Sequence, residues 1–235
     1  MIGLALADLV TAAEPYWWTA QGPSEAPDPA DAARPLCAVL DFGVKYNILR
    51  RLRAEGFRVR VLPARTPAAD VLALDPAGLL LSNGPGDPQP LDFAIATVRE
   101  LAPKLPTLGI CLGHQLLGLA FGGRTGKLRF GHRGINHPVI DLRTRAVEVT
   151  SQNHGFFVDI DTLPTGEFEV THVSGNDQSL EGMIHRKLPV FACQYHPESA
   201  PGPHDSRPWF RAFADAVTQR SAARRWTAPA PAGVR

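Results

Sequence analysis

Cys111 is the residue whose setting points most clearly to chemistry. It stands in the segment Gly-Ile-Cys-Leu-Gly at positions 109–113, between an apolar run that favours a strand and the apolar run 113–121 that favours a helix. In such a sharp strand-to-helix turn, flanking glycines allow tight packing and hold the central side chain over the carboxyl edge of the sheet, where open α/β sheets bind ligands. The nearby helix N-terminus favours the thiolate. We therefore predict that Cys111 is a nucleophile.

A cysteine that attacks an amide needs a partner to protonate the leaving nitrogen, most often a histidine held by a third polar group. His196 directly follows the apolar run 189–195, which places it at a strand end, and Pro197 breaks the strand so that His196 and Glu198 leave the sheet together. Glu198 can then fix the imidazole tautomer and stabilise the imidazolium. The spacing alone equally fits an ordinary surface turn.

Donors for a developing oxyanion are available at two places. The backbone N–H of Leu112 follows the predicted nucleophile, and the loop Asn-Gly-Pro-Gly-Asp-Pro at 83–88 can bring bare backbone against a ligand at Gly84 and Gly86. The alternative for this loop is a tight surface turn. It does not fit a phosphate cradle, because no Lys-Ser or Lys-Thr follows it, and we predict no nucleotide site in this chain.

Two histidines, His132 and His137, are close enough in sequence to suggest a metal site. No carboxylate or third ligand is suitably spaced, and the surrounding glycines favour a loop. We expect a structural role for both histidines and predict no metal.

Alternating strand and helix patterns position these residues. An α/β fold is predicted, with a mostly parallel twisted sheet flanked by helices. Strands are expected at 36–41, 57–63, 76–83 and 106–110, and helices at 46–56, 91–102 and 113–121. After Gly122 the pattern favours additional strands, at 137–142, 146–152, 168–173 and 189–195, which extend or flank the sheet, followed by a last helix at about 205–219.

The two ends of the chain differ in composition from the middle. Residues 1–35 read as a residual N-terminal segment followed by a Pro- and Ala-rich linker at 21–35, and residues 219–235 as a disordered tail. One domain is therefore expected at 36–218.

The amino-acid composition limits the kinds of partner and the cellular location that can be expected. With 24 Lys and Arg against 23 Asp and Glu, the formal charge of +1 gives no reason to expect nucleic acid or an anionic membrane. No run approaches the length of a membrane span, and the N-terminus lacks the features of a signal peptide. Cys37 and Cys193 lie inside predicted strands and read as buried core thiols, without the spacing of a zinc site or a disulfide framework. A reduced, cytoplasmic protein is expected.

Three of these motifs, in order, resemble those of the class I (triad-type) glutamine amidotransferases: NGPGDP at 83–88, GICLGHQ at 109–115 and HPE at 196–198. Within that class the chain is similar to the glutaminase (small) subunit of carbamoyl-phosphate synthetase, through DFGVKYNILR, FGHRGINHP, QNHGF and HPESAPGPHD. The resemblance covers about residues 36–215. It implies a flavodoxin-like class I amidotransferase fold.

The resemblance also implies an activity and its residues. Cys111 would form a glutamyl thioester, with His196 and Glu198 completing the triad. The glutamine contacts that it implies are Gly84, Gly86, Leu112, Gln115, Asn153, Gly155 and Phe156. Ammonia would pass to a large synthetase subunit, which uses bicarbonate and ATP to make carbamoyl phosphate for arginine and pyrimidine synthesis; no cofactor is expected in this chain.

Family members carry a separate N-terminal domain before the amidotransferase domain. Residues 1–19 resemble the end of the segment that joins the two, so most of that domain is expected to be absent here. Three alternatives stay open. They are an amidotransferase domain of another pathway (anthranilate, GMP or CTP synthesis), a truncated non-catalytic remnant that only binds a partner, and a cysteine hydrolase or peptidase on a similar fold.

Overall fold

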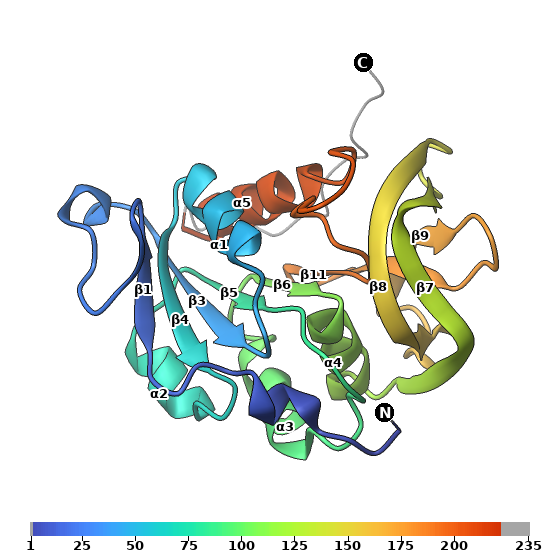
Figure 1. Cartoon of the computed structure of the whole chain (residues 1–235), viewed down its shortest axis with the longest axis horizontal. Helices are drawn as coiled ribbons and strands as arrows, with labels where there is room; N and C mark the ends of the chain where they lie inside the picture. Colours follow the sequence, from blue (N-terminus) through green and yellow to red (C-terminus); the bar gives the residue numbers. More distant parts are fainter. Residues whose placement is uncertain (1, 222–235) are drawn as a thin grey trace.

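The computed structural model describes residues 2–221, which form one mixed sheet with helices on both faces (Figure 1). The sheet has 11 strands in the order β2-β1-β4-β3-β5-β6-β11-β10-β9-β7-β8. Its parallel centre consists of β4 (Arg58–Pro63), β3 (Leu36–Asp41), β5 (Gly78–Leu81), β6 (Thr107–Ile110) and β11 (Val190–Cys193). The predicted α/β class, with a mostly parallel centre and additional strands, is confirmed.

Alternation along the central strands explains the two layers of helices. In β3, Ala38 and Leu40 face one apolar core, whereas Cys37 and Val39 face the other. The first core is covered by α2 (Ala68–Ala73), α3 (Asp92–Leu101) and α4 (Leu112–Ala120). The second core is covered by α1 (Tyr46–Ala54) and α5 (Pro208–Ser221), which lie together on the opposite face in Figure 1. Strands buried on both faces account for the continuous apolar runs in the sequence.

The antiparallel part of the sheet differs from the prediction in length and register. It comprises β10 (Leu180–His185), β9 (Phe168–Ser174), β7 (Arg124–Asp141) and β8 (Val147–Asp159), followed by the short helix η3 (Ile160–Thr162). His132 and His137 therefore lie on β7; the loop predicted around them is wrong, whereas the strand predicted from 137 is the end of β7. The β7–β8 pairing contains register shifts between Lys127 and His132 and between Gly134 and His137, which accommodate the glycines that suggested a loop.

The N-terminal segment is built into the same sheet. Strand β1 (Tyr16–Thr19) pairs with β4 and with β2 (Gly22–Ser24), and the short helices η1 (Leu6–Leu9) and η2 (Pro29–Asp31) flank this hairpin. The linker predicted at 21–35 thus contains β2 and η2. Arg53 of α1 holds this stretch through Asp31 at 2.8 Å and Asp28 at 2.9 Å, contacts that local composition does not reveal.

The last helix extends through the start of the predicted tail. Residues 219–221 belong to α5, and the remainder of the tail, 222–235, lies outside the described residues. Within residues 2–221, no helix is both long enough and apolar enough to cross a bilayer.

Candidate active site

Cys111 sits at the end of β6, as the residue that caps the N-terminus of α4. Its backbone angles are φ 54° and ψ −102°, outside the regions that L-residues ordinarily occupy. Its N–H donates to the carbonyl of Cys193 on β11, at 2.9 Å. The turn therefore holds the thiol at the carboxyl edge of the parallel strands, as the G-x-C-x-G pattern predicted.

Tight packing explains the glycine after the nucleophile. A Cβ on Gly113 would lie 2.2 Å from the carbonyl oxygen of Leu81, because α4 begins directly against β5. Gly113 N–H also donates to the carbonyl of Ser82 at 3.1 Å. No side-chain rearrangement can relieve an overlap with backbone.

A Gly113→Ala variant is therefore expected to lose roughly 3 kcal/mol of unfolding free energy, at the upper end of the usual cost of overpacking. Chemical denaturation followed by circular dichroism would measure the loss. Gly175→Ala is the matched control: its added methyl would lie 3.2 Å from Pro138, a tight contact that shifts of a few tenths of an ångström relieve, so a smaller loss is expected. Equal stability of the two variants would contradict this account of the turn.

His196 and Glu198 converge on the cysteine from the segment after β11. His196 Nδ1 donates to Glu198 Oε1 at 2.9 Å, and the His196 side chain also hydrogen-bonds with Cys111. All three side chains are buried, with Glu198 fully so. Burial lowers the pKa of His196, but the bonds to Cys111 and Glu198 outweigh it and raise that pKa to about 9. The site therefore favours an imidazolium beside the nucleophile at neutral pH.

Lys45 is a site residue that the sequence analysis did not assign. It lies directly before α1, and its Nζ is 3.1 Å from Glu198 Oε1. Burial raises the pKa of Glu198, whereas the His196 hydrogen bond, the charge of His196 and the Lys45 cation lower it, with a net lowering. Asn47 adds a hydrogen bond from its Nδ2 to the Glu198 carbonyl. Glu198 is thus held as a carboxylate between two cations.

Loops at the ends of β3 and β5 complete one side of the site. Asn83 Oδ1 accepts the N–H of Lys45 at 3.0 Å, and Asn83 Nδ2 donates to the carbonyl of Gly43 at 3.0 Å. A Cβ on Gly84 would lie 2.2 Å from the carbonyl oxygen of Phe42, so only glycine fits where the two loops touch. The loop 83–88 is therefore part of the site.

A cavity of about 340 Å³ opens over the cysteine. Eight predicted residues line it: Cys111, His196, Gly84, Gly86, Gln115, Asn153, Gly155 and Phe156. The other two predicted residues do not: Glu198 lies behind His196, and Leu112 is buried at the start of α4.

The opposite wall of the cavity comes from β7 and β8. The Phe156 carbonyl accepts a hydrogen bond from Gln115 Nε2 at 3.0 Å, which ties this wall to α4. His154 and Arg133 also line the cavity and were not predicted as site residues. The position of His154 inside QNHGF, between two predicted glutamine contacts, could have indicated that it belongs to the site. Arg133 reaches the cavity because it pairs with Asn153 across β7 and β8.

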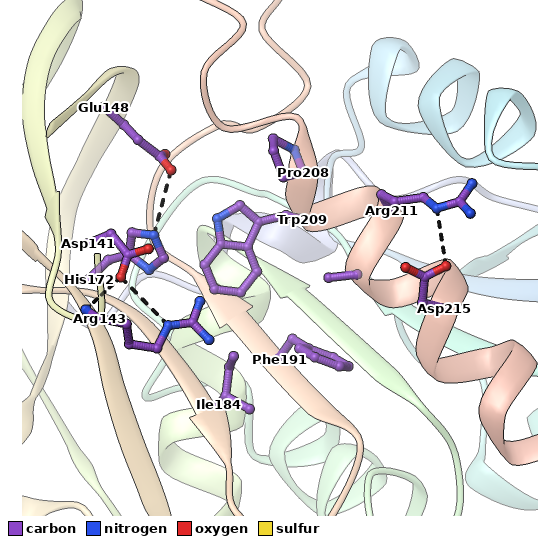
Figure 2. Close-up of a pocket in the computed structure, with 11 residues that line it drawn as sticks. Asp141, Arg143, Glu148, His172, Ile184, Phe191, Pro208, Trp209, Arg211 and Asp215 are labelled. Carbon is purple, nitrogen blue, oxygen red and sulfur yellow. Dashed lines mark hydrogen bonds and ion pairs between the residues drawn. The ribbon is translucent and has the colours of Figure 1, made fainter. Parts of the chain in front are cut away.

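A second cavity, of about 200 Å³, lies between α5 and the antiparallel strands (Figure 2). Ile184, Phe191 and Trp209 form its apolar part. Ion pairs surround it, between Asp141 and Arg143, His172 and Glu148, and Arg211 and Asp215. Trp209 Nε1 donates to Tyr195 Oη at 2.8 Å, and Tyr195 directly precedes His196. One residue of its lining, Trp209, thus braces the segment that carries His196, and no cysteine lines the cavity.

Comparisons with known proteins agree with this geometry. The sequence model of the family "Glutamine amidotransferase class-I" matches residues 38–216. A carbamoyl phosphate synthase small chain from Solidesulfovibrio magneticus is 51% identical over 226 residues, covering 94% of this chain and 60% of that protein. The corresponding small chain from Thermus thermophilus is 58% identical over 179 residues, covering 76% and 45%. The chain thus spans about half the length of these relatives.

The fold is shared with a solved structure as well. A putative GMP synthase protein from Thermoplasma acidophilum superimposes with a TM-score of 0.68 at 23% identity, covering 81% of this chain and 97% of that chain. At this identity the likeness concerns the fold alone. The family match over most of the chain, with the triad motifs placed together at the sheet edge, supports one conclusion: the chain belongs to the class I glutamine amidotransferase family.

Proposed function

We propose that this chain hydrolyses glutamine to glutamate and ammonia, as the amidotransferase part of a carbamoyl phosphate synthase small chain. The ammonia passes to a large synthetase subunit, which binds ATP and makes carbamoyl phosphate for arginine and pyrimidine synthesis. The chain itself needs no cofactor for this reaction. We also propose a cytoplasmic location, which the three free thiols of the chain favour.

One observation carries the proposal. Cys111, His196 and Glu198 form a continuous hydrogen-bonded chain that ends at the floor of a cavity large enough for an amino acid. A nucleophile, a base and a group that orients the base are the elements that acyl transfer from an amide requires.

The chemistry follows from this arrangement. The Cys111 thiolate attacks the side-chain amide carbon of glutamine, and the backbone N–H groups of Leu112 and Gly84 are the proposed donors to the oxyanion. The His196 imidazolium gives its proton to the amide nitrogen, so that ammonia leaves and a thioester forms. Neutral His196 then takes a proton from water, which attacks the thioester and releases glutamate and the cysteine.

The remaining alternatives differ in what receives the ammonia or in whether any is made. A domain of another pathway would keep the same triad, but identities of 51% and 58% to carbamoyl phosphate synthase small chains favour that acceptor. A non-catalytic remnant would have no use for three buried triad residues in which His196 is bonded to both Cys111 and Glu198.

The test is glutamine hydrolysis by the purified chain, measured as glutamate and ammonia release with and without the large partner of a carbamoyl phosphate synthase. We expect release that depends on Cys111 and rises when the large partner is present. Release that the large partner leaves unchanged would contradict the proposed assembly. A folded chain that releases nothing in either condition would support the non-catalytic alternative.

A further inference from the structure

A buried charged network lies behind the β8 wall of the catalytic cavity. Glu181 of β10 is fully buried, and its Oε1 is 3.2 Å from His132 Nδ1. The other ring nitrogen of His132, Nε2, is 2.8 Å from Asp177 Oδ2. Glu181 Oε2 accepts a hydrogen bond from Gln152 Nε2 at 2.9 Å. Nothing in the proposed reaction uses His132, Asp177 or Glu181 directly.

The hydrogen-bond geometry determines the charges in this network. Both ring nitrogens of His132 face carboxyl oxygens of acidic side chains, and ionised carboxylates only accept, so with both carboxylates charged both nitrogens donate and the ring is an imidazolium. The bond to Glu181 is the largest cause that raises the pKa of His132, to about 9, against the opposing effect of burial. Burial raises the pKa of Glu181 above its usual value, and the bonds from His132 and Gln152 limit that rise without reversing it. The network therefore contains a buried ion pair.

These contacts do not favour a metal site. His132, His154 and Glu181 offer ligand atoms within 4.8 Å of one another, the one such group among residues 2–221. However, both nitrogens of His132 and both oxygens of Glu181 already have hydrogen-bond partners. A metal would have to displace these bonds.

The network reaches the cavity through Gln152. With its NH₂ directed at the Glu181 carboxylate, the Gln152 carbonyl oxygen faces His154, 2.9 Å from Nε2. His154 Nδ1 is 2.8 Å from the carbonyl oxygen of Phe156. Burial lowers the pKa of His154 to about 3, so the neutral ring has one N–H for these two oxygens. Its orientation therefore depends on how firmly Gln152 is held.

We propose that Glu181 is a positioning residue for glutamine binding. Through Gln152 it orients His154, and through His132 it fixes β7 against β8, so that Asn153, Gly155 and Phe156 face the substrate correctly. This inference rests on the proposed function. Its expected signature is a change in KM for glutamine with little change in kcat, because Glu181 makes no side-chain hydrogen bond to Cys111, His196 or Glu198.

The test compares Glu181→Gln with a double variant, Glu181→Met with His132→Phe. Glu181→Gln removes the charge and leaves the His132 cation paired with Asp177 alone. The double variant replaces the whole buried pair with apolar groups, an exchange that often leaves stability unchanged or higher. Any change in glutamine binding that persists in a double variant of unchanged Tm therefore cannot come from lost stability.

In both variants we expect KM for glutamine to rise about tenfold, the effect of losing one well-placed polar contact, with kcat within about threefold of the parent. Asp31→Asn is the matched control. It also removes a buried carboxylate from an ion pair, with Arg53, in the N-terminal segment, so it is expected to lower Tm and leave KM unchanged.

Histidine side-chain NMR on the full chain gives a readout that does not require turnover. The resonances of the His154 ring are expected to move in the double variant and to stay in place in Asp31→Asn. A parent enzyme that hydrolyses glutamine and a double variant with parental KM and parental His154 resonances would overturn the positioning role while leaving the function intact. If the parent shows no hydrolysis, the function fails, and unmoved His154 resonances would still overturn the inference by themselves.

Discussion

Replacing Cys111 with alanine is expected to lower glutamine hydrolysis roughly 10⁴-fold or more, because removal of a nucleophile that acts as a unit with its base removes nearly all of the covalent pathway. The loss should appear in kcat, since the remaining cavity, including Gln115 and the β8 wall, stays available to bind glutamine. Steady-state glutamate release and glutamine affinity by calorimetry would measure the two effects separately.

The other two cysteines should not substitute for Cys111. Cys37 and Cys193 are fully buried within strands, and burial raises the pKa of each thiol. A glutamine-like chloroketone should therefore alkylate the parent chain once, at Cys111, as read by peptide mass spectrometry. Cys37→Ala serves as the matched control and should keep its labelling and activity. Labelling of the Cys111→Ala variant at another cysteine, with glutamine protection, would contradict the assignment.

The sequence predicts the central layers well because their pattern is local. Strands buried on both faces give continuous apolar runs, and the glycines around Cys111 indicate a strand-to-helix turn that the structure contains. The same reasoning placed Cys111 and His196 at strand ends, which parallel strands bring to one edge of the sheet.

The antiparallel strands were harder to predict because their stability comes from pairing. Residues 130–138 contain glycine, asparagine and proline, which are typical of loops, yet β7 continues through them. Gly131 and Gly134 adopt positive φ values of 72° and 140° near the register shifts, so the glycines permit an irregular strand. The register against β8 depends on contacts that are distant in sequence.

The site residues that the sequence did not predict were missed for the same reason, because their roles depend on contacts between residues distant in sequence. Lys45 and Glu198 are separated by most of the chain, and only the shared carboxyl edge of the parallel strands, where the segments after β3 and β11 both lie, brings Nζ to within 3.1 Å of the carboxylate. Likewise, His132 on β7 and Glu181 on β10 are 49 residues apart, on strands that β9 separates in the sheet, so only the folded sheet brings their side chains within hydrogen-bond distance. Motif spacing identifies the nucleophile, while the electrostatic surroundings that govern its partner emerge from the folded sheet.

The electrostatic surroundings of His196 give the second prediction with a large expected effect. Glu198→Gln is expected to lower kcat roughly 10³-fold, since an amide neither stabilises the imidazolium nor selects its productive tautomer. It should also change the pH profile. The imidazolium of His196 persists up to about pH 9 in the parent, so kcat/KM should fall as pH rises through about 9. Without the carboxylate, the effect of burial is opposed less, the pKa of His196 falls, and the alkaline limb moves to lower pH.

Lys45→Met is the matched variant, and it is expected to shift the alkaline limb of the pH profile in the opposite direction. Removing this cation leaves the Glu198 charge less compensated, so the carboxylate attracts a proton on His196 more strongly. The alkaline limb should then move to higher pH. The same linkage applies to stability: because the folded pKa of His196 is raised from 6.5, its contribution is complete below that value and is lost as pH rises through about 9. Movement of both limbs in one direction would mean that Glu198 does not set the His196 pKa. Opposite movement would identify the Lys45–Glu198–His196 arrangement as the element that keeps a proton ready for the departing ammonia.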